Sequence, residues 1–132
     1  MTNSFIDNLD VYVQAVLGKK AGELIVLDVH NLSSVADAFI ICSGRSNRQV
    51  QAIAEHIRQE LKKHHLKPLS IEGIQEGHWV LIDYGDVIIH VFYEPVRSFY
   101  DLEGLWTDAR RVETESMKNI PPPDPAEDTF DE

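Results

Sequence analysis

Two stretches of the chain repeat their hydrophobic residues with the spacing of an amphipathic helix. One covers residues 4–17. The other starts after Ser46, which suits a helix N-cap with Gln49 at the reciprocal position of a capping box, and ends before Pro68. The pattern therefore predicts two long helices, each with one buried face. The periodic residues are Phe5, Leu9, Val13, Val16 and Leu17 in the first, and Val50, Ile53, Ala54, Ile57 and Leu61 in the second.

Short apolar runs of strand length lie between and after these helices. Pro95 interrupts the last run and predicts a loop, and a new helical spacing predicts a terminal helix over Leu102–Val112. The order αββαβββα has no repeated βαβ unit. We therefore expect the α/β class, with a mixed β-sheet of about five strands flanked by helices. The predicted strands are Glu23–Val29, Ala38–Cys42, Leu69–Glu72, His78–Asp83 and Val87–Tyr93.

The length of 132 residues fits one folded unit, which we place at residues 1–112. Residues 113–132 carry seven acids against one base and four of the six prolines. Such a segment cannot build a core, so it predicts an acidic, proline-containing disordered tail. The tail is interpreted first as a solubilising terminus, and second as an electrostatic arm toward a basic partner.

The net charge of −10 restricts the partners. Binding to phosphates needs clustered Lys and Arg, so a whole-surface or sequence-specific nucleic-acid binder is disfavoured, as is an anionic membrane. No run approaches the ~20 apolar residues of a membrane span. The single cysteine, Cys42, excludes an internal disulfide and a multi-cysteine zinc site. We expect a soluble, cytoplasmic protein.

Motifs for catalysis or cofactors are weak. Gly44–Ser46 lies between a strand and a helix and could present N–H groups to a phosphate, but it lacks the glycines and lysine of a P-loop. No strand carries a D-x-D pair for magnesium, since Asp83 and Asp86 are three apart across a turn. The six histidines show no metal-ligand spacing. We predict no enzyme activity, no cofactor and no metal site, with a nucleotide-binding enzyme kept as the alternative.

The most informative region is 78–106, which holds seven aromatic residues, five acids and a single arginine, Arg97, with a further acid at Asp108. Aromatic side chains with one polar end anchor protein interfaces, and an acidic surround suits a basic protein better than a phosphate. Some of these aromatics belong to the core. Two of them are the least expected to be core residues: Trp79, which opens a strand, and Tyr100, which follows the proline. The region thus predicts a binding surface for a basic protein.

The same region resembles the signature of the ribosomal silencing factor family, also called Iojap-like. The pattern is a tryptophan opening a strand, an acidic D-x-G-D turn, V-I-x-H-V-F, and R-x-x-Y-x-L-E-x-L-W. The resemblance continues upstream through residues 27–54 and covers about 5–108, without the acidic tail. The matching positions are Trp79, Asp83–Asp86, Val87–Phe92 with His90, Arg97, Tyr100, Leu102, Glu103, Leu105 and Trp106.

The resemblance implies a nucleotidyltransferase-like α/β fold without catalytic carboxylates. It also implies binding to the large ribosomal subunit through its fourteenth ribosomal protein, which blocks joining of the small subunit and represses translation when nutrients are scarce. Homodimers are expected, and a large-subunit assembly factor is a further alternative. On this basis we expect Trp79 and Tyr100 to be apolar anchors and His90 and Arg97 to fix the local geometry. The acids expected to face Lys or Arg are Asp83, Asp86, Asp101 and Glu103.

Overall fold

The computed structural model describes residues 4–119 as an α/β fold with one mixed sheet. The α/β class and the flanking helices are confirmed, and a sixth, very short strand is added to the five that were predicted. In chain order the elements are α1 (Ser4–Leu17), β1 (Gly22–Asp28), β2 (Ala38–Gly44), α2 (Asn47–Lys62), β3 (Ser70–Glu72), β4 (Trp79–Asp83), β5 (Val87–Tyr93), α3 (Glu94–Tyr100), α4 (Leu102–Leu105), β6 (Arg110–Val112) and the 3₁₀ helix η1 (Glu115–Asn119).

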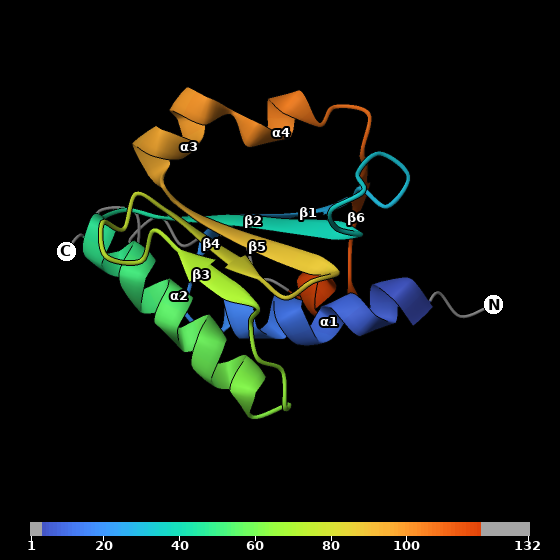
Figure 1. Ribbon diagram of the computed structural model, residues 1–132, viewed down its shortest axis with the longest axis horizontal. Helices are drawn as coiled ribbons and strands as arrows, with labels where there is room; N and C mark the ends of the chain where they lie inside the picture. Colours follow the sequence, from blue (N-terminus) through green and yellow to red (C-terminus); the bar gives the residue numbers. More distant parts are fainter. Residues whose placement is uncertain (1–3, 120–132) are drawn as a thin grey trace.

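The sheet has the order β3-β4-β5-β2-β1-β6 (Figure 1). Only β2 and β5 run parallel, and every other neighbouring pair is antiparallel. These two strands lie at the centre, and all of β2 and six of the seven residues of β5 are buried. Apolar side chains on both faces are what a central strand covered on each side requires.

One face of the sheet carries the two long helices, α1 and α2 (Figure 1). The stripe predicted for α2 is buried as a whole, and Ser46 caps this helix by accepting from the N–H of Gln49 at 3.0 Å. The Gln49 side chain reaches back to the N–H of Arg45 at 2.6 Å. A large apolar core is buried on this face, and it includes Val13, Val16, Ile40, Ile53, Ile57, Leu61, Val80, Ile82, Ile89 and Val91.

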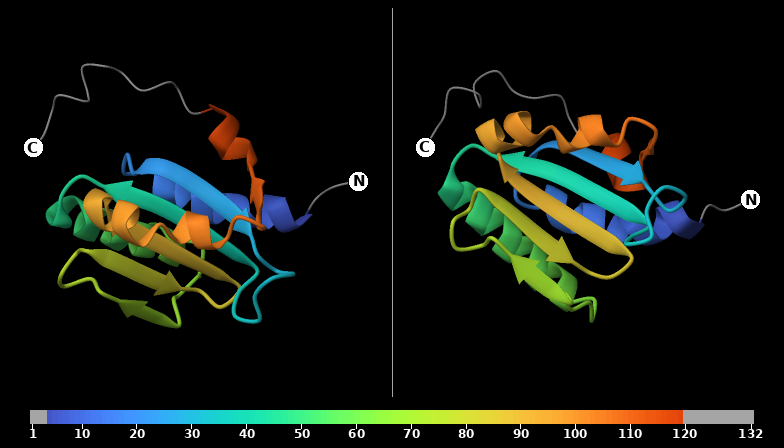
Figure 2. Two further views of the ribbon diagram at one scale, coloured as in Figure 1. Left: turned by 90° about the horizontal axis from the view of Figure 1, so that it is seen from above. Right: turned by 45° about the horizontal axis from the view of Figure 1, so that its top comes forward.

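The opposite face carries only the short helices α3 and α4, which lie over the middle of the sheet and leave β3 and β4 uncovered on that side (Figure 2). A smaller core forms beneath them, and it is built largely from aromatic and branched residues. Its buried members are Leu27, Val29, Ala36, Phe39, Ile41, Ile88 and Phe92, with Trp79, Leu81, Val96, Leu102 and Trp106 partly buried against it.

Two predictions near the C-terminus were wrong. Pro95 does not leave a loop, because it stands in the first turn of α3, where a missing N–H costs nothing. The helix predicted over Leu102–Val112 stops at Leu105, and the chain then forms β6 against β1. Of the four residues expected on one side of that helix, Leu102, Trp106 and Ala109 pack against the smaller core, whereas Leu105 is exposed.

The first residues of the predicted tail belong to the fold. Thr114 is fully buried, and Ser116 donates both its N–H and its hydroxyl to the carboxylate of Asp10, at 2.9 and 2.7 Å. Burial alone would raise the pKa of Asp10, but the polar groups around it, which include the hydrogen bonds from Ser116 and Gln14, outweigh this effect and lower the pKa. Residues 113–119 are thus held on α1, and the rest of the predicted tail, 120–132, lies outside the described residues.

Candidate functional site

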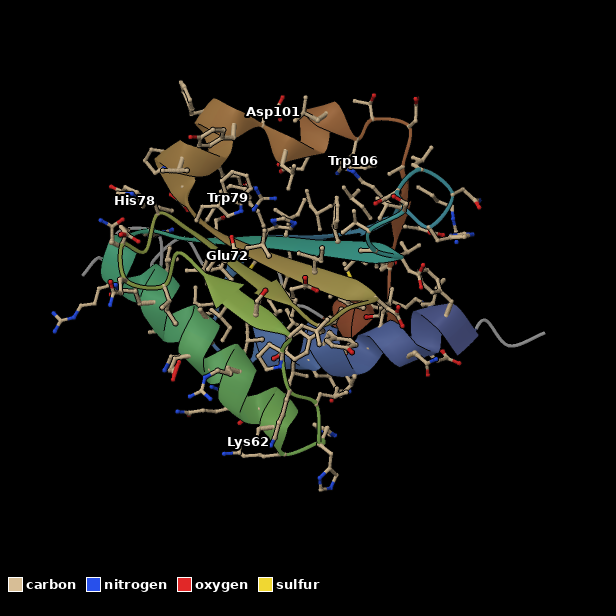
Figure 3. The ribbon with its side chains drawn as sticks, viewed as in Figure 1. Lys62, Glu72, His78, Trp79, Asp101 and Trp106 are labelled. Carbon is tan, nitrogen blue, oxygen red and sulfur yellow. The ribbon has the colours of Figure 1, made fainter. Side chains whose placement is uncertain are left out.

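Trp79 opens β4 and points to the side of the sheet that carries α3 and α4 (Figure 3). Its indole N–H donates to Nδ1 of His90 at 3.1 Å, across the β4–β5 pair. Its ring lies 4.7 Å from that of Phe92, centre to centre. Because β3 and β4 are uncovered here, the other side of the indole stays partly exposed. Trp79 is therefore a half-buried aromatic with a fixed orientation.

His90 supports Trp79 from within the sheet. It is 4% exposed, and burial lowers its pKa to about 4. The ring is therefore neutral at physiological pH. Nδ1 of His90 accepts the hydrogen bond from Trp79, so the proton of the neutral imidazole ring resides on Nε2. Nε2 has no hydrogen-bond partner among the described residues. The edge-on contact with Phe39, at 5.1 Å and 82°, completes its packing. His90 can hold an indole in place but is a poor proton donor or acceptor in solution.

Arg97 ties the two short helices to the sheet. This side chain of α3 is 6% exposed. Its Nε donates to Oε2 of Glu103 at 2.9 Å, and a guanidinium N–H donates to the Ser43 hydroxyl at 3.1 Å. Glu103 itself is turned inward, with a side chain only 17% exposed. This differs from the expectation that Glu103 faces a basic partner, because its Oε2 binds Arg97 and its Oε1 is buried without a hydrogen-bond partner.

Tyr100 and Asp101 lie at the junction of α3 and α4, close to Trp79. The ring of Tyr100 is 51% exposed and 5.1 Å from the indole, and Phe99 is 80% exposed beside it at 5.1 Å. Asp101 adopts the left-handed backbone conformation, with φ of 48°, and its carboxylate accepts from the N–H of Gly104 at 3.3 Å. We call the set Trp79, Phe99, Tyr100 and Asp101 the aromatic surface.

The other two predicted acids do not join the aromatic surface. Asp83 ends β4, so it lies about 13 Å from Trp79, four residues at roughly 3.3 Å each. Its Oδ1 accepts from the N–H of Gly85 at 2.8 Å and stabilises the β4–β5 turn. Asp86 is exposed in the same turn, close enough to Tyr12 that its charge adds to burial in raising the pKa of that phenol. The acids near the aromatics in sequence are thus split between two ends of a strand.

The described residues offer little for cofactor chemistry. Residues 4–119 contain no group of three or more His, Cys, Asp or Glu side chains placed to hold a metal. Cys42 is buried, and this burial raises the pKa of its thiol to about 12. Ser46 is engaged as a helix cap. Within the same range no helix is both long and apolar enough to cross a membrane.

Comparison with known proteins agrees with the sequence motifs. A family model described as "Ribosomal silencing factor during starvation" matches residues 2–131, so the match extends across the segment predicted as a tail. Ribosomal silencing factor RsfS of Bacillus subtilis is 44% identical over 101 residues, which cover 76% of this chain and 86% of that protein. A more distant mouse protein is named "Mitochondrial assembly of ribosomal large subunit protein 1"; it is 31% identical over 105 residues, covering 76% of this chain and 45% of that one.

The fold also matches a solved structure. A crystal structure of a Bacillus halodurans protein superposes with a TM-score of 0.72 at 39% identity, covering 81% of this chain and 97% of the other. Sequence and fold therefore agree over most of the chain. It belongs to the ribosomal silencing factor, or Iojap, family, which comprises ribosome-binding repressors of translation rather than enzymes.

Proposed function

We propose that this protein binds the large ribosomal subunit through its fourteenth ribosomal protein, by means of the aromatic surface, and thereby blocks joining of the small subunit. The observation that carries the proposal is the contact between Trp79 and Tyr100, two aromatic rings 5.1 Å apart that are both partly exposed. Clustered aromatics that keep exposed area are the usual anchors of a protein interface.

Charge supports a protein contact at this surface. Asp101 is exposed beside the two anchors, whereas the carboxylate of Glu94 lies near Gly22 of β1, on the other side of β2. Carboxylates around an apolar centre attract a basic ribosomal protein and repel phosphate. Asp83 and Asp86 are too far from Trp79 to share this centre, so we place them at a separate, peripheral contact. His90, Arg97 and Glu103 act as positioning residues, since each is buried or nearly so behind the surface.

Subunit joining is then prevented by the volume that the protein occupies, and no chemical step is needed. Silencing during starvation follows from the same block, since a large subunit that cannot pair cannot translate. The bacterial relative favours a cytoplasmic place of action. A homodimer stays a prediction, and we propose for it the exposed Leu105, which lies outside the aromatic surface.

The test measures joining of purified bacterial subunits by sedimentation, with and without the protein. We expect the wild-type protein to reduce the full-ribosome peak. Trp79→Ala should weaken binding to the large subunit by about 2 kcal/mol or more if Trp79 is a hot spot. Leu69→Ala, which alters an exposed leucine outside this surface, serves as the matched control and should bind normally. Unchanged subunit joining, or equal affinities of the two variants, would contradict the proposal.

A second candidate is a factor for assembly of the large subunit, which the name of the mouse relative favours. The two roles differ in what deletion does. An assembly factor leaves immature large subunits when it is absent, whereas a silencing factor leaves mature subunits that join too freely in starved cells. Sucrose-gradient profiles of a deletion strain in rich and poor medium separate these outcomes.

A further inference from the structure

A cluster of basic residues surrounds the C-terminal end of α2 and the loop that follows it. Arg58, Lys62, Lys63 and Lys67 lie within ten residues, together with His64 and His65. The only acids in this part of the chain are Glu55 and Glu60. In a protein of net charge −10, a local excess of positive charge is unexpected, and it has no part in the contact proposed above.

Two of these cations have partners, and two do not. Arg58 donates from Nε to Glu55 at 3.2 Å, and Lys63 pairs with Glu60 at 2.9 Å. Within residues 4–119, the side chains of Lys62 and Lys67 make no ion pair or hydrogen bond, and both residues are exposed. Their charges are therefore available to a ligand.

The helix dipole explains only part of this cluster. A cation in the last turn of a helix is stabilised by the partial negative charge of its C-terminus, and Lys62 is the basic residue of that turn. Lys67 lies five residues beyond the last residue of α2, where the dipole has little effect. The helix dipole therefore does not explain why a cation stands at Lys67.

Arg58, Lys62 and Lys67 are among the residues that line an open surface pocket. Its volume is about 240 Å³, and Leu66 and Pro68 form its apolar part. Ligand sites for whole small molecules usually occupy ~300–1,000 Å³ and enclose their ligand. A smaller, cationic pocket with an apolar floor suits one phosphate and its sugar in a longer chain rather than a free nucleotide.

The position of this pocket fits a second contact. Figure 3 shows Lys62 at the end of α2, on the opposite side of the sheet from Trp79 and Asp101. If the aromatic surface binds the ribosomal protein, the basic cluster therefore faces away from that contact. The surface of a ribosome is largely RNA, and phosphates are recognised by exposed Lys and Arg without regard to sequence.

We propose that Lys62 and Lys67, with Arg58, form a contact site for the phosphate backbone of RNA. This inference goes beyond the proposed contact with a ribosomal protein and does not depend on it. The overall charge opposes binding to RNA in general, but it is screened within a Debye length of ~8 Å at physiological salt, so a local cluster can act alone. The contact would add affinity and salt dependence without sequence specificity.

The test uses the full chain and a short fluorescein-labelled RNA hairpin, with binding followed by fluorescence anisotropy between about 50 mM and about 200 mM salt. Lys62→Glu/Lys67→Glu is compared with Arg111→Glu/Lys118→Glu, which makes the same charge change near β6, at the other edge of the sheet. We expect the first variant to bind roughly 10-fold more weakly near 0.1 M salt and to lose part of the salt slope. The control should keep both.

Three results would overturn the proposal: no saturable binding of RNA by the wild-type protein at low salt, equal losses in the two charge-matched variants, or equal binding of polyglutamate, which would indicate an acidic protein as the partner. Trp79→Ala separates the two proposals. It should weaken binding to the large subunit while leaving the RNA affinity unchanged. Because the probe holds no ribosomal protein, either result can fail alone.

Discussion

The two faces of the sheet differ in how they are covered. The face under α1 and α2 buries a large, mainly apolar core, and the polar groups near it are uncharged hydroxyls such as those of Tyr84 and Thr114. The face under α3 and α4 holds a buried histidine, a buried arginine and an ion pair among its apolar residues. Two long helices cover the first face, whereas the short helices leave part of the second uncovered (Figure 2).

This difference separates stability from binding. Apolar burial contributes most of the free energy of folding but specifies orientation weakly. Hydrogen bonds and ion pairs contribute less net stability, yet they fix where a side chain points. The second face uses them for this purpose: His90 orients Trp79, and Arg97 fixes α3 against α4, where Tyr100 and Asp101 lie. If this is correct, mutations on the two faces should affect different measurements.

The largest effect on stability is expected on the α1/α2 face. Ile57 is fully buried there, and Ile57→Ala removes its packing and leaves a cavity. We expect a loss of about 2–5 kcal/mol in the free energy of unfolding, measured by urea titration. The fraction that remains folded should bind the large subunit with unchanged affinity. A weakened affinity of the folded fraction would show that the two faces are not separate in function.

Arg97→Met tests the other face. It leaves the carboxylate of Glu103 without its partner, so we expect a loss of about 3 kcal/mol, near the lower limit for a broken buried pair because Glu103 can regain some water. Unlike Ile57→Ala, this change should also weaken binding by the folded fraction.

The double variant Arg97→Met/Glu103→Leu is the control for that prediction. It removes both charges, so its loss of stability should be smaller than the sum of the two single losses. Additive losses of stability would mean that Arg97 and Glu103 act independently. If Arg97→Met, Glu103→Leu and the double variant all bind the large subunit like the wild type, the two residues have no positioning role.

Sequence patterns predicted the first face better than the second. The stripe of α2 and the unbroken run of β5 are local periodicities that follow directly from burial. The role of Arg97 depends on Ser43, 54 residues away, and on Glu103 turning inward, which no local pattern contains. The grouping of the acids used neighbours in sequence, whereas in the structure an extended strand separates Asp83 from Trp79. Pro95 was mistaken for the end of an element when it begins one.

His90 should make stability depend on pH. Burial lowers its pKa to about 4 in the folded protein, whereas the unfolded chain has an ordinary histidine pKa near 6.5. The unfolded state therefore binds the proton first, so stability falls as pH is lowered from about 6.5 toward 4. The expected contribution between pH ~6.5 and ~5 is roughly 2 kcal/mol.

The matched variant for this effect is His90→Asn, which removes the titrating group but can keep an acceptor for the indole of Trp79. The difference in stability between wild type and variant, measured by urea titration at several pH values, should shrink or change sign as the pH falls through this window. A difference that does not vary with pH would show that His90 is not held neutral by burial.

The smallest effect on stability is expected at Asp101, whose side chain both caps α4 and belongs to the aromatic surface. Asp101→Asn keeps an oxygen that can accept from Gly104, and Asn tolerates the left-handed backbone. Stability should therefore change by less than about 0.5 kcal/mol. Asp101→Ala loses the cap and should cost about 1 kcal/mol or more.

If the charge of Asp101 contacts a basic ribosomal protein, both variants should bind more weakly at low salt, and high salt should reduce the difference from wild type. If only the alanine variant binds more weakly, Asp101 serves to shape the junction of α3 and α4, and recognition belongs to the aromatic rings alone.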